Sequence, residues 1–443
     1  MKIQLSEHFT YSKLLRFVFP SIVMMIFTSI YGVVDGIFVS NYVGSTSFAA
    51  VNLIWPFVMA TGAVGFMLGT GGSAIVAKTM GEGKEKRANE YFSMLIYVNA
   101  AAGILLSIIG FLFIRPITQL LGARETLLEE AALYGRILLL GNAAFMLQNS
   151  FQSFFPVAEK PQTGLLVTVA AGITNMVMDY LLIAVFQLGL IGAAAATVLS
   201  YFVGGILPIF YFAKKNPSRL KLVKTKFYGR ELLKSCTNGS SEMMSNLSMS
   251  IVNMLYNLQL IKIAGENGVA AYGVIMYVNF IFVAVFIGYA IGSAPIIGFH
   301  YGSGNQAELK NLFKKSLVII LVGSVSMTGL AEISALPLSK IFVGYDEVLL
   351  EMTQHGFCIF SLSFLFSGFN IFSSAFFTAL NNGAVSAAIS FLRTLIFQII
   401  SVIVLPILFG IDGIWMAVVV AEILAMCIAA ILLLKKRKTY HYL

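Results

Sequence analysis

An acidic residue lies inside a long apolar stretch of this chain. The segment "TNMVMDYLLI", residues 174–183, places Asp179 in an apolar run from about Leu165 to Phe186. If that run crosses a lipid bilayer, an aspartate at its centre costs roughly 2.5–3.5 kcal/mol, and a carboxylate in such a place is a functional candidate. Asn175 lies four residues earlier, which puts its side chain on the same face of a helix, one turn away.

Two other polar residues lie at the same depth in the predicted helices. Asp179 is about eight residues before a turn near residue 187, and Thr197 is about eight residues after it. Asp35 is about eight residues before another turn, near residue 43. At a rise of 1.5 Å per residue, all three lie about 12 Å below the same membrane surface. We therefore expect them to form one layer with the asparagine.

This layer offers only oxygen ligands. Two carboxylates, an amide oxygen and a hydroxyl suit a proton or a small hard cation such as Na⁺, and they suit zinc or copper poorly. Two carboxylates at close range in a low dielectric cannot easily both carry a charge. The pair is therefore predicted to take up and release a proton or a cation. In the alternative interpretation, Asp179 only hydrogen-bonds a neighbouring helix.

The composition predicts the bilayer that this chemistry needs. Hydrophobic residues make up 58% of the 443 residues and charged residues 11%, whereas charged residues form about a quarter of ordinary soluble domains. Apolar stretches of about 20 residues predict an all-α polytopic membrane protein with twelve transmembrane helices. The predicted helices are 14–42, 47–77, 91–113, 133–155, 163–186, 190–213, 235–262, 269–298, 316–336, 354–379, 384–408 and 412–434.

The positive charges follow the connections between these helices. The 29 Lys and Arg residues exceed the 20 Asp and Glu residues, and most of them share one side of the membrane if both termini are cytoplasmic. This pattern indicates attraction to anionic membrane lipid rather than binding to nucleic acid. We expect a multi-pass protein of the cell inner (cytoplasmic) membrane, with both termini in the cytoplasm. Residues 1–16 are too polar for a signal-peptide core, so the first helix is expected to be an uncleaved anchor.

The chain repeats itself at an offset of about 221 residues. Gly44 aligns with Gly265, Gly71 aligns with Gly292, and the other helix pairs follow without a gap. Because each unit has an even number of helices, the two units have the same orientation, as in many transporters. We expect an N-lobe with helices 1–6 at 1–213, a cytoplasmic linker at 214–234, and a C-lobe with helices 7–12 and a short basic tail at 235–443.

The two halves differ at the candidate layer. At the repeat offset, Asp35 becomes Tyr256 and Asp179 becomes Ile400. Packing in the duplicated fold therefore does not require carboxylates at these places, which favours a functional role for them in the N-lobe.

Several motifs occur in both halves and in the same order. They are "GEGKEKRANEYF" and "GSGNQAELKNLF" after the second and eighth helices, and "GLIGAA" and "GIDGIW" at the start of the sixth and twelfth. Together with the repeat, they resemble the multidrug and toxic compound extrusion (MATE) family over essentially the whole chain. The resemblance implies a V-shaped pair of six-helix lobes. It also implies the export of small organic, often cationic, compounds in exchange for H⁺ or Na⁺.

The resemblance extends to the candidate layer. Asp35, the Asn-x-x-x-Asp spacing of Asn175 and Asp179, and Thr197 match the cation site in the N-lobe of one prokaryotic MATE branch. A coupling H⁺ or Na⁺ is expected there. We expect no other cofactor, no enzymatic activity, and a monomer.

Four further polar residues are candidates for a substrate or a second acid site. Glu242 lies near the start of a predicted helix, where a second functional acid and a helix-packing acid are equally compatible with the sequence. Gln148, Asn149 and Gln152 lie on one predicted helix and either line a cavity or bond to a neighbouring helix.

The sequence favours structural roles for two charged residues and three cysteines. Arg393 and Glu422 lie at similar depths on consecutive predicted helices, which favours an ion pair over a substrate contact. The cysteines have no CxxC spacing and no histidine partners, so we expect small buried residues rather than a metal site or disulfide. They are Cys236, Cys358 and Cys427.

Two other functions stay open. A flippase for lipid-linked oligosaccharides has a related architecture, but such proteins usually line their cavity with more cationic residues than this chain offers. An intramembrane aspartyl protease also needs two aspartates, but Asp179 follows "MVM" rather than Gly-x-Gly, and a protease has no need of the repeat.

Overall fold

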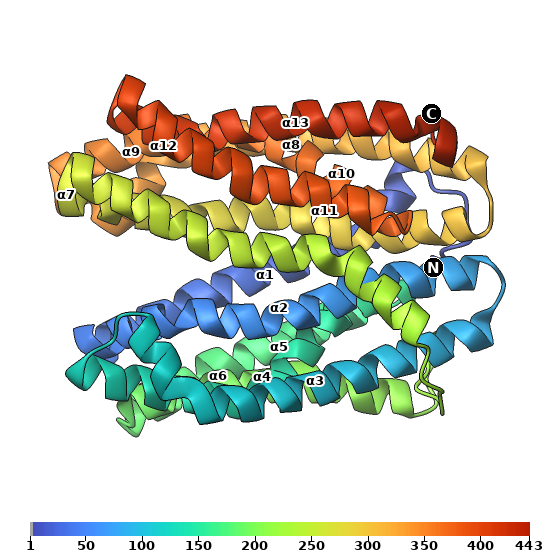
Figure 1. Ribbon diagram of the computed structural model, residues 1–443, viewed down its shortest axis with the longest axis horizontal. Helices are drawn as coiled ribbons and strands as arrows, with labels where there is room; N and C mark the ends of the chain where they lie inside the picture. The colour runs from blue at the N-terminus through green and yellow to red at the C-terminus, as the bar shows by residue number, and fades with distance from the viewer. Residues whose placement is uncertain (1–2) are drawn as a thin grey trace.

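The computed structural model describes residues 3–443, apart from the side chains of Ser40, Asn41 and Ser45. The described residues form helices and connections, with no strand among them. Figure 1 shows the helices running along the long axis of the molecule in two groups. The first group contains α1 (Tyr11–Tyr42), α2 (Ser45–Gly81), α3 (Glu85–Leu120), α4 (Glu125–Val157), α5 (Pro161–Asp179), the π-helical segment η1 (Tyr180–Val185) and α6 (Gly189–Ala213).

The second group follows after an extended connection, residues 214–228. It contains α7 (Gly229–Gly302), α8 (Gln306–Val343), α9 (Glu347–Ser361), α10 (Phe364–Ala379), α11 (Gly383–Phe391), the π-helical segment η2 (Leu392–Ile396), α12 (Phe397–Phe409) and α13 (Ile411–Tyr440). We call α1–α6 the first half and α7–α13 the second half.

The helices have the length and composition of membrane spans. Among the described residues, ten helices are long and apolar enough to cross a bilayer, and α9 and α10 form one more span with a bend of 47°. The longest helix, α7, has 74 residues and is interrupted at Gly265, where φ is 63° and ψ is −151°. This interruption divides α7 into two spans. The all-α polytopic fold with twelve spans is therefore confirmed.

The structure differs from the sequence-based expectations in two helix boundaries and in the burial of the cysteines. No separate loop joins the seventh and eighth predicted helices, because α7 continues through that region with the single break at Gly265. The last six residues of the predicted linker, 229–234, are already part of α7. Cys427 is exposed and Cys236 and Cys358 are half-buried, contrary to the expectation of buried side chains, while all three cysteines are free.

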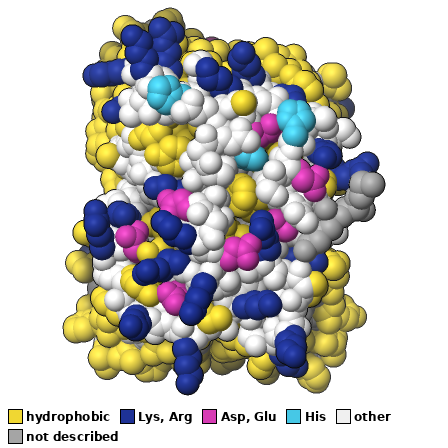
Figure 2. Space-filling view, turned by 90° about the vertical axis from the view of Figure 1, so that its right-hand side faces the viewer, with side chains coloured by type: hydrophobic (Ala, Val, Ile, Leu, Met, Phe, Trp, Pro, Cys, Tyr) yellow, Lys and Arg dark blue, Asp and Glu magenta, His cyan; other side chains and the backbone are white. Residues whose placement is uncertain are grey.

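Both chain ends and the connection between the halves lie at the same end of the molecule (Figure 1). Figure 2 shows this end face, on which Lys and Arg side chains are numerous and Asp and Glu side chains are interspersed. We call it the basic end, and we call the other end of the helices the opposite end.

The two halves pack most closely toward the basic end, through glycines. A Cβ atom at Gly71 of α2 would collide with the backbone of Ser235 in α7, and one at Gly239 would collide with the backbone of Met67. Glycine permits this approach because it lacks the Cβ atom. Further contacts of this kind join Gly81 to Phe299, Gly302 to Lys78, Gly288 to Ile22 and Gly292 to Val18.

Glycines toward the opposite end have a different environment. Neither Gly32 of α1 nor Gly273 of α7 has an atom of another residue within 4 Å of where its Cβ would lie. The close backbone contacts between the halves are therefore concentrated at the basic end, while toward the opposite end a Cβ at Gly36 of α1 would lie 3.8 Å from the hydroxyl of Tyr277 in α7.

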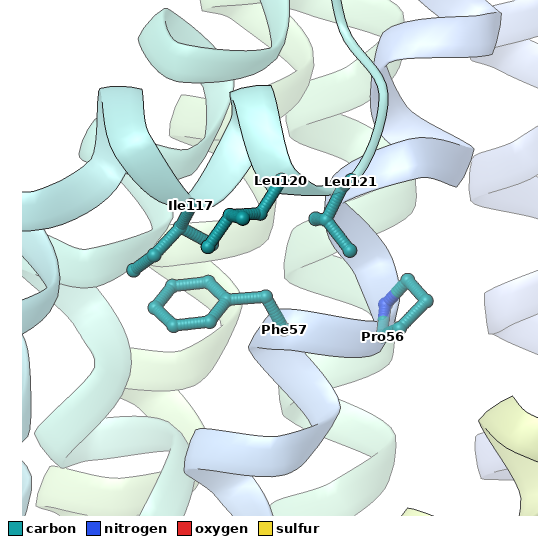
Figure 3. Close-up of a pocket in the computed structure, with 5 residues that line it drawn as sticks. All are labelled: Pro56, Phe57, Ile117, Leu120 and Leu121. Atoms are coloured by element: carbon teal, nitrogen blue, oxygen red, sulfur yellow. The ribbon is translucent and has the colours of Figure 1, made fainter.

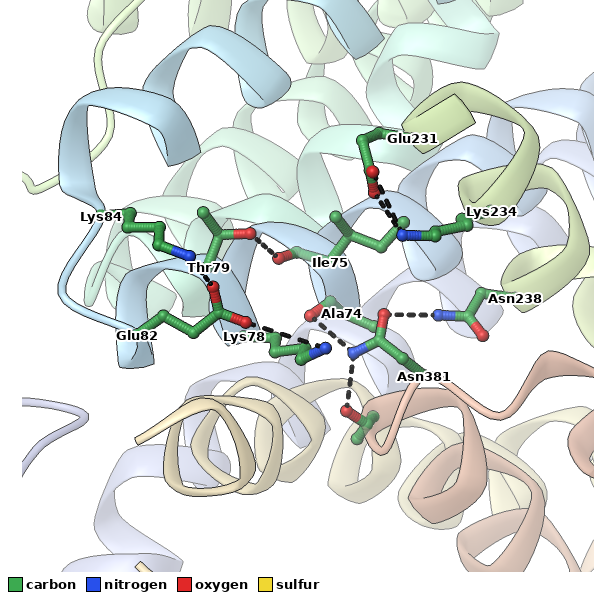
Figure 4. A network of polar contacts seen from close by, with 11 residues as sticks. Ala74, Ile75, Lys78, Thr79, Glu82, Lys84, Glu231, Lys234, Asn238 and Asn381 are labelled. Carbon is green, nitrogen blue, oxygen red and sulfur yellow. Dashed lines mark hydrogen bonds and ion pairs between the residues drawn. The ribbon is translucent and has the colours of Figure 1, made fainter. Parts of the chain in front are cut away.

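Polar contacts reinforce the closed end (Figure 4). The Asn381 side chain, in the turn between α10 and α11, donates a hydrogen bond of 3.5 Å to the carbonyl of Ala74 in α2. Asn238 of α7 donates one of 2.9 Å to the amide oxygen of Asn381. The bond to Ala74 connects the second half to the backbone of the first, and the bond from Asn238 holds the Asn381 side chain in place.

Candidate functional site

The two predicted site residues of α5 lie at its C-terminal end. Asn175 and Asp179 are 2% and 0% exposed, and they follow one another by one helical turn. Pro161 is compatible with the first turn of α5, where the amide hydrogen it lacks has no helical partner. Directly after Asp179 the backbone widens into the π-helical segment η1. Such segments are frequent at functional sites because they reorient the side chains around them.

Helix α5 packs between α1 and α6, which brings the predicted residues together. The side chain of Asp35 on α1 is within interaction range of the Asp179 and Asn175 side chains. Yet neither oxygen of Asp179, nor Oδ1 of Asp35, nor Oδ1 of Asn175 has a properly formed hydrogen bond within the described part of the chain. The site thus gathers buried acceptor oxygens without donors, an arrangement that is costly unless something satisfies them.

Thr197 joins the same layer from α6. The residue is 6% exposed, and its hydroxyl donates a hydrogen bond of 3.1 Å to the carbonyl of Ala193, which leaves the lone pairs of the hydroxyl oxygen available. Tyr134 of α4 lies within interaction range of Thr197 and of both aspartates. Because Tyr134 is close to all three residues, the Thr197 hydroxyl and the two carboxylates lie in one polar region.

The chemistry of the donor set fits a proton or a small hard cation. The unsatisfied atoms are carboxylate and amide oxygens, which Na⁺ shares as ligands with other hard cations. Within residues 3–443 there is no group of three or more His, Cys, Asp or Glu residues that could hold a metal ion. With only two acids, the layer does not resemble a site for a transition metal.

Three tyrosines that the sequence analysis did not single out surround the aspartates. Tyr31 and Tyr201, like Tyr134, lie within interaction range of Asp35. A sequence signal for two of them exists: Tyr31 is four residues before Asp35, and Tyr201 is four residues after Thr197. Residues four apart lie on one helix face, so the search could have been extended by one turn.

The three polar residues of α4 are all buried, at 4–5% exposure, but they lie in different surroundings. Gln148 interacts with Tyr31 and packs against Gly204, which places it beside the aspartate layer. The carbonyl of Asn149 instead lies against Gly69 of α2, at the helix interface. Gln152 lies one turn beyond Gln148 in the direction of the basic end.

A second intramembrane charge cluster lies in the second half. Arg393 Nη2 is 2.8 Å from Glu422 Oε1, and Asn370 donates a hydrogen bond of 2.6 Å to Glu422 Oε2. The expected ion pair is therefore present. Glu242 of α7 lies within electrostatic range of Arg393, so it belongs to this cluster and not to the aspartate layer.

The repeat positions of the two aspartates are filled differently. Tyr256 is 2% exposed, donates a hydrogen bond of 3.0 Å to Gln398, and stacks on Tyr272 with ring centroids 4.9 Å apart. Ile400 is 52% exposed. The second half thus replaces one carboxylate with a satisfied aromatic residue and the other with an apolar side chain on its surface.

A pocket elsewhere in the first half lacks the groups for such chemistry. It lies between α2 and the end of α3, and Figure 3 shows its lining of Pro56, Phe57, Ile117, Leu120 and Leu121. All five side chains are apolar, and Leu120 is 88% exposed. The pocket is an apolar surface feature, separate from the aspartate layer.

Comparison with known proteins gives consistent matches over the chain. The family model described as MatE matches residues 20–181 and 243–404, one stretch in each half. The chain is 24% identical to the multidrug export protein MepA of Staphylococcus saprophyticus, over 96% of this chain and 94% of that protein. It is also 24% identical to MepA of Staphylococcus haemolyticus, over 94% and 91%.

Solved structures agree with the fold. A crystal structure of MATE in complex with MaL6 superposes with a TM-score of 0.93 at 22% identity, over 98% of both chains. An outward-facing conformation of a multidrug resistance MATE family transporter gives 0.92 at 23% identity, over 98% of this chain and 97% of that one.

Proposed function

Because the chain belongs to the MatE family, we propose that it is a secondary active antiporter that exports small organic compounds across the cytoplasmic membrane. The basic end faces the cytoplasm, and the opposite end faces outward. The observation that carries this proposal is the pair of carboxylates, Asp35 and Asp179, with buried oxygens that lack donors. A site of this kind gains free energy when it takes up H⁺ or Na⁺.

The proposed cycle uses the aspartate layer as the coupling site. In the conformation closed at the basic end, H⁺ or Na⁺ from outside neutralises the pair Asp35 and Asp179, with oxygen ligands from Asn175 and Thr197. Uptake of the positive charge favours the release of substrate. The halves then open at the basic end, where the ion leaves and substrate enters.

The membrane potential can drive this exchange. Moving one elementary charge through 100 mV supplies about 2.3 kcal/mol, which corresponds to a roughly fiftyfold concentration ratio. A single H⁺ or Na⁺ per substrate therefore suffices for modest export.

The proposed substrates are organic cations. Two carboxylates in a low dielectric favour positive charge, and the aromatic faces of Tyr31, Tyr134 and Tyr201 favour cations as well. The Staphylococcus relatives, named as multidrug export proteins, support a broad substrate range.

Ethidium efflux from proteoliposomes tests the proposal. We expect efflux when either a pH gradient or a Na⁺ gradient is imposed, and loss of efflux when the matching ionophore collapses that gradient. Substrate binding to the detergent-solubilised protein should also release the coupling ion, because linkage between two ligands is reciprocal. Efflux that needs neither gradient would contradict the antiport mechanism.

The same preparation separates the alternative functions. Transfer of a fluorescent lipid-linked oligosaccharide between leaflets, without ethidium efflux, would identify a flippase instead. Cleavage of a transmembrane peptide that stops when Asp35 or Asp179 is replaced would identify a protease, for which the family match gives no support.

A further inference from the structure

The segment before α1 lies across the basic end and contacts both halves. We call residues 3–10 the strap. Two of its apolar side chains, Leu5 and Phe9, are 0% exposed. They belong to an apolar cluster that includes residues of the first half, such as Phe154, and of the second half, such as Phe313. The strap is therefore part of the packing between the halves at the basic end.

A buried carboxylate of the first half binds the beginning of the strap. Glu159, in the turn between α4 and α5, is 5% exposed, and its Oε1 accepts a hydrogen bond of 3.0 Å from the backbone of Leu5. The same oxygen accepts one of 3.2 Å from Arg219, in the connection between the halves. Arg219 also lies 5.8 Å from the ring centroid of Phe299 in α7. Strap and connection thus meet at one carboxylate.

A buried carboxylate of the second half binds the end of the strap. Glu308, in the first turn of α8, is 5% exposed and accepts a hydrogen bond of 2.9 Å from the backbone of Phe9. Its other oxygen lies 2.6 Å from Nδ1 of His8. The carbonyl of Phe9 accepts hydrogen bonds from Asn311 and Lys315 of α8, at 3.0 and 2.6 Å.

These contacts fix the strap to two bodies at once. Only three residues separate Leu5, bound to the first half, from Phe9, bound to the second half. Glu7 adds two further restraints on the strap. It pairs with Lys13 at the start of α1 at 2.7 Å, and it accepts a hydrogen bond from the backbone of Gln4 within the strap. A separation of the halves at this end therefore strains or breaks one of the two attachments.

One buried histidine of the second half lies against the strap. His300, near the end of α7, is 2% exposed, and its ring lies within interaction range of the backbone of Leu5 and Glu7, although neither ring nitrogen forms a hydrogen bond of good geometry within the described residues. Its ring meets that of Phe9 edge to face, with centroids 6.4 Å apart. The strap therefore covers a buried polar side chain of the second half and contacts it through both backbone and ring.

We propose that the strap is a latch that holds the basic end closed, with Glu159 and Glu308 as its attachments on the two halves. At least one attachment must be released before the halves separate at this end. The latch sets the balance between the two conformations of the protein. This role is independent of which compound or ion is transported.

Thiol labelling measures opening of the basic end directly. Ser235 is 1% exposed and lies in the interface with Gly71. In a background with the three native cysteines replaced by serine, the Ser235→Cys reporter should react slowly with a maleimide. Leu5→Glu combined with Phe9→Ala should accelerate this reaction at least tenfold, and Glu308→Gln should accelerate it several-fold.

Two controls keep the test decisive. Glu231→Gln removes a carboxylate at the basic end that forms an ion pair with Lys234 of its own helix, and it should leave the labelling rate unchanged. A Ser401→Cys reporter, buried in α12, should stay unreactive in Glu308→Gln unless the protein unfolds. The proposal is overturned if the strap variants label Ser235→Cys at the parent rate, or if both reporters accelerate equally in Glu308→Gln. Because labelling needs no substrate or gradient, failure of the transport proposal would leave this result unaffected.

Discussion

The carboxyl groups of Asp35 and Asp179 approach each other from α1 and α5, and three of their four oxygens are buried without a hydrogen-bond partner in the described chain. This relationship separates a coupling role from a packing role. A packing aspartate is satisfied by donors from the neighbouring helix, whereas this pair lacks them. A proton or cation that binds reversibly would supply the partner that these oxygens lack.

Removal of either charge tests the coupling role. We expect Asp35→Asn and Asp179→Asn each to reduce gradient-driven ethidium efflux at least tenfold, while the melting temperature in detergent stays close to that of the parent. Neutralising an acid in the membrane removes a burial cost instead of adding one. Ile400→Ala, at the repeat position of Asp179, is the matched control and should retain efflux. Efflux at the parent rate in both Asn variants would assign the aspartates to packing.

The neutral ligands should contribute less. Asn175→Ala and Thr197→Ala each delete one uncharged oxygen, so we expect partial loss of efflux and a weaker apparent affinity for the coupling ion. Net contributions of about 0.5–1.5 kcal/mol per interaction correspond to a two- to twelvefold change. The change in apparent affinity is measured from the dependence of the efflux rate on the concentration of the coupling ion. An unchanged ion dependence in both variants would remove these residues from the site.

The orientation in the membrane can be tested with exposed positions. In the cysteine-free background, Lys224→Cys and Thr439→Cys at the basic end should react with an impermeant thiol reagent only after cells are opened. Tyr345→Cys, at the turn between α8 and α9, is 84% exposed and should react in intact cells. The reverse pattern would place the basic end outside.

The glycine contacts between the halves give a stability prediction. Gly71→Ala would place a methyl group against the backbone of Ser235 and Gly239, and backbone atoms cannot move aside as the end of a flexible side chain can. Overpacking of this kind typically costs about 1–3 kcal/mol, and here the cost falls on the conformation closed at the basic end. Thermal unfolding in detergent should shift downward. Gly273→Ala, with open space around it, should instead be neutral or slightly stabilising.

The ion pair of the second half should be structural. Glu422→Gln leaves Arg393 without its charged partner inside the membrane, and breaking a buried pair costs about 3–5 kcal/mol. We expect a marked fall in melting temperature, with recovery when Arg393→Met is added. Glu231→Gln, which breaks a more exposed pair with Lys234, should change stability by at most about 1 kcal/mol. Normal stability of Glu422→Gln together with altered substrate range would indicate a substrate contact instead.

The twelve spans and the internal repeat could be predicted from sequence because apolar stretches and glycine spacing are local signals. The common layer of Asp35, Asp179 and Thr197 could be reached by counting depth along helices. Tyr134 could not be reached in this way, since its place beside the layer depends on how α4 packs. Likewise, the contacts of Glu159 and Glu308 with the strap join residues far apart in the chain. No periodic pattern encodes them.

The break at Gly265 has a mechanical consequence. Its backbone conformation is one that only glycine adopts readily, and the two limbs of α7 that meet there both reach the first half at the basic end. The limbs form two levers that share a pivot at the opposite end. Each lever has roughly 36 residues and is about 55 Å long at 1.5 Å per residue. A rotation of about 10° at Gly265 would move the tip of one limb by about 10 Å relative to the other. Because both limbs belong to the second half, a small change in the dihedral angles of one glycine would rearrange the surface that this half presents to the first half at the basic end.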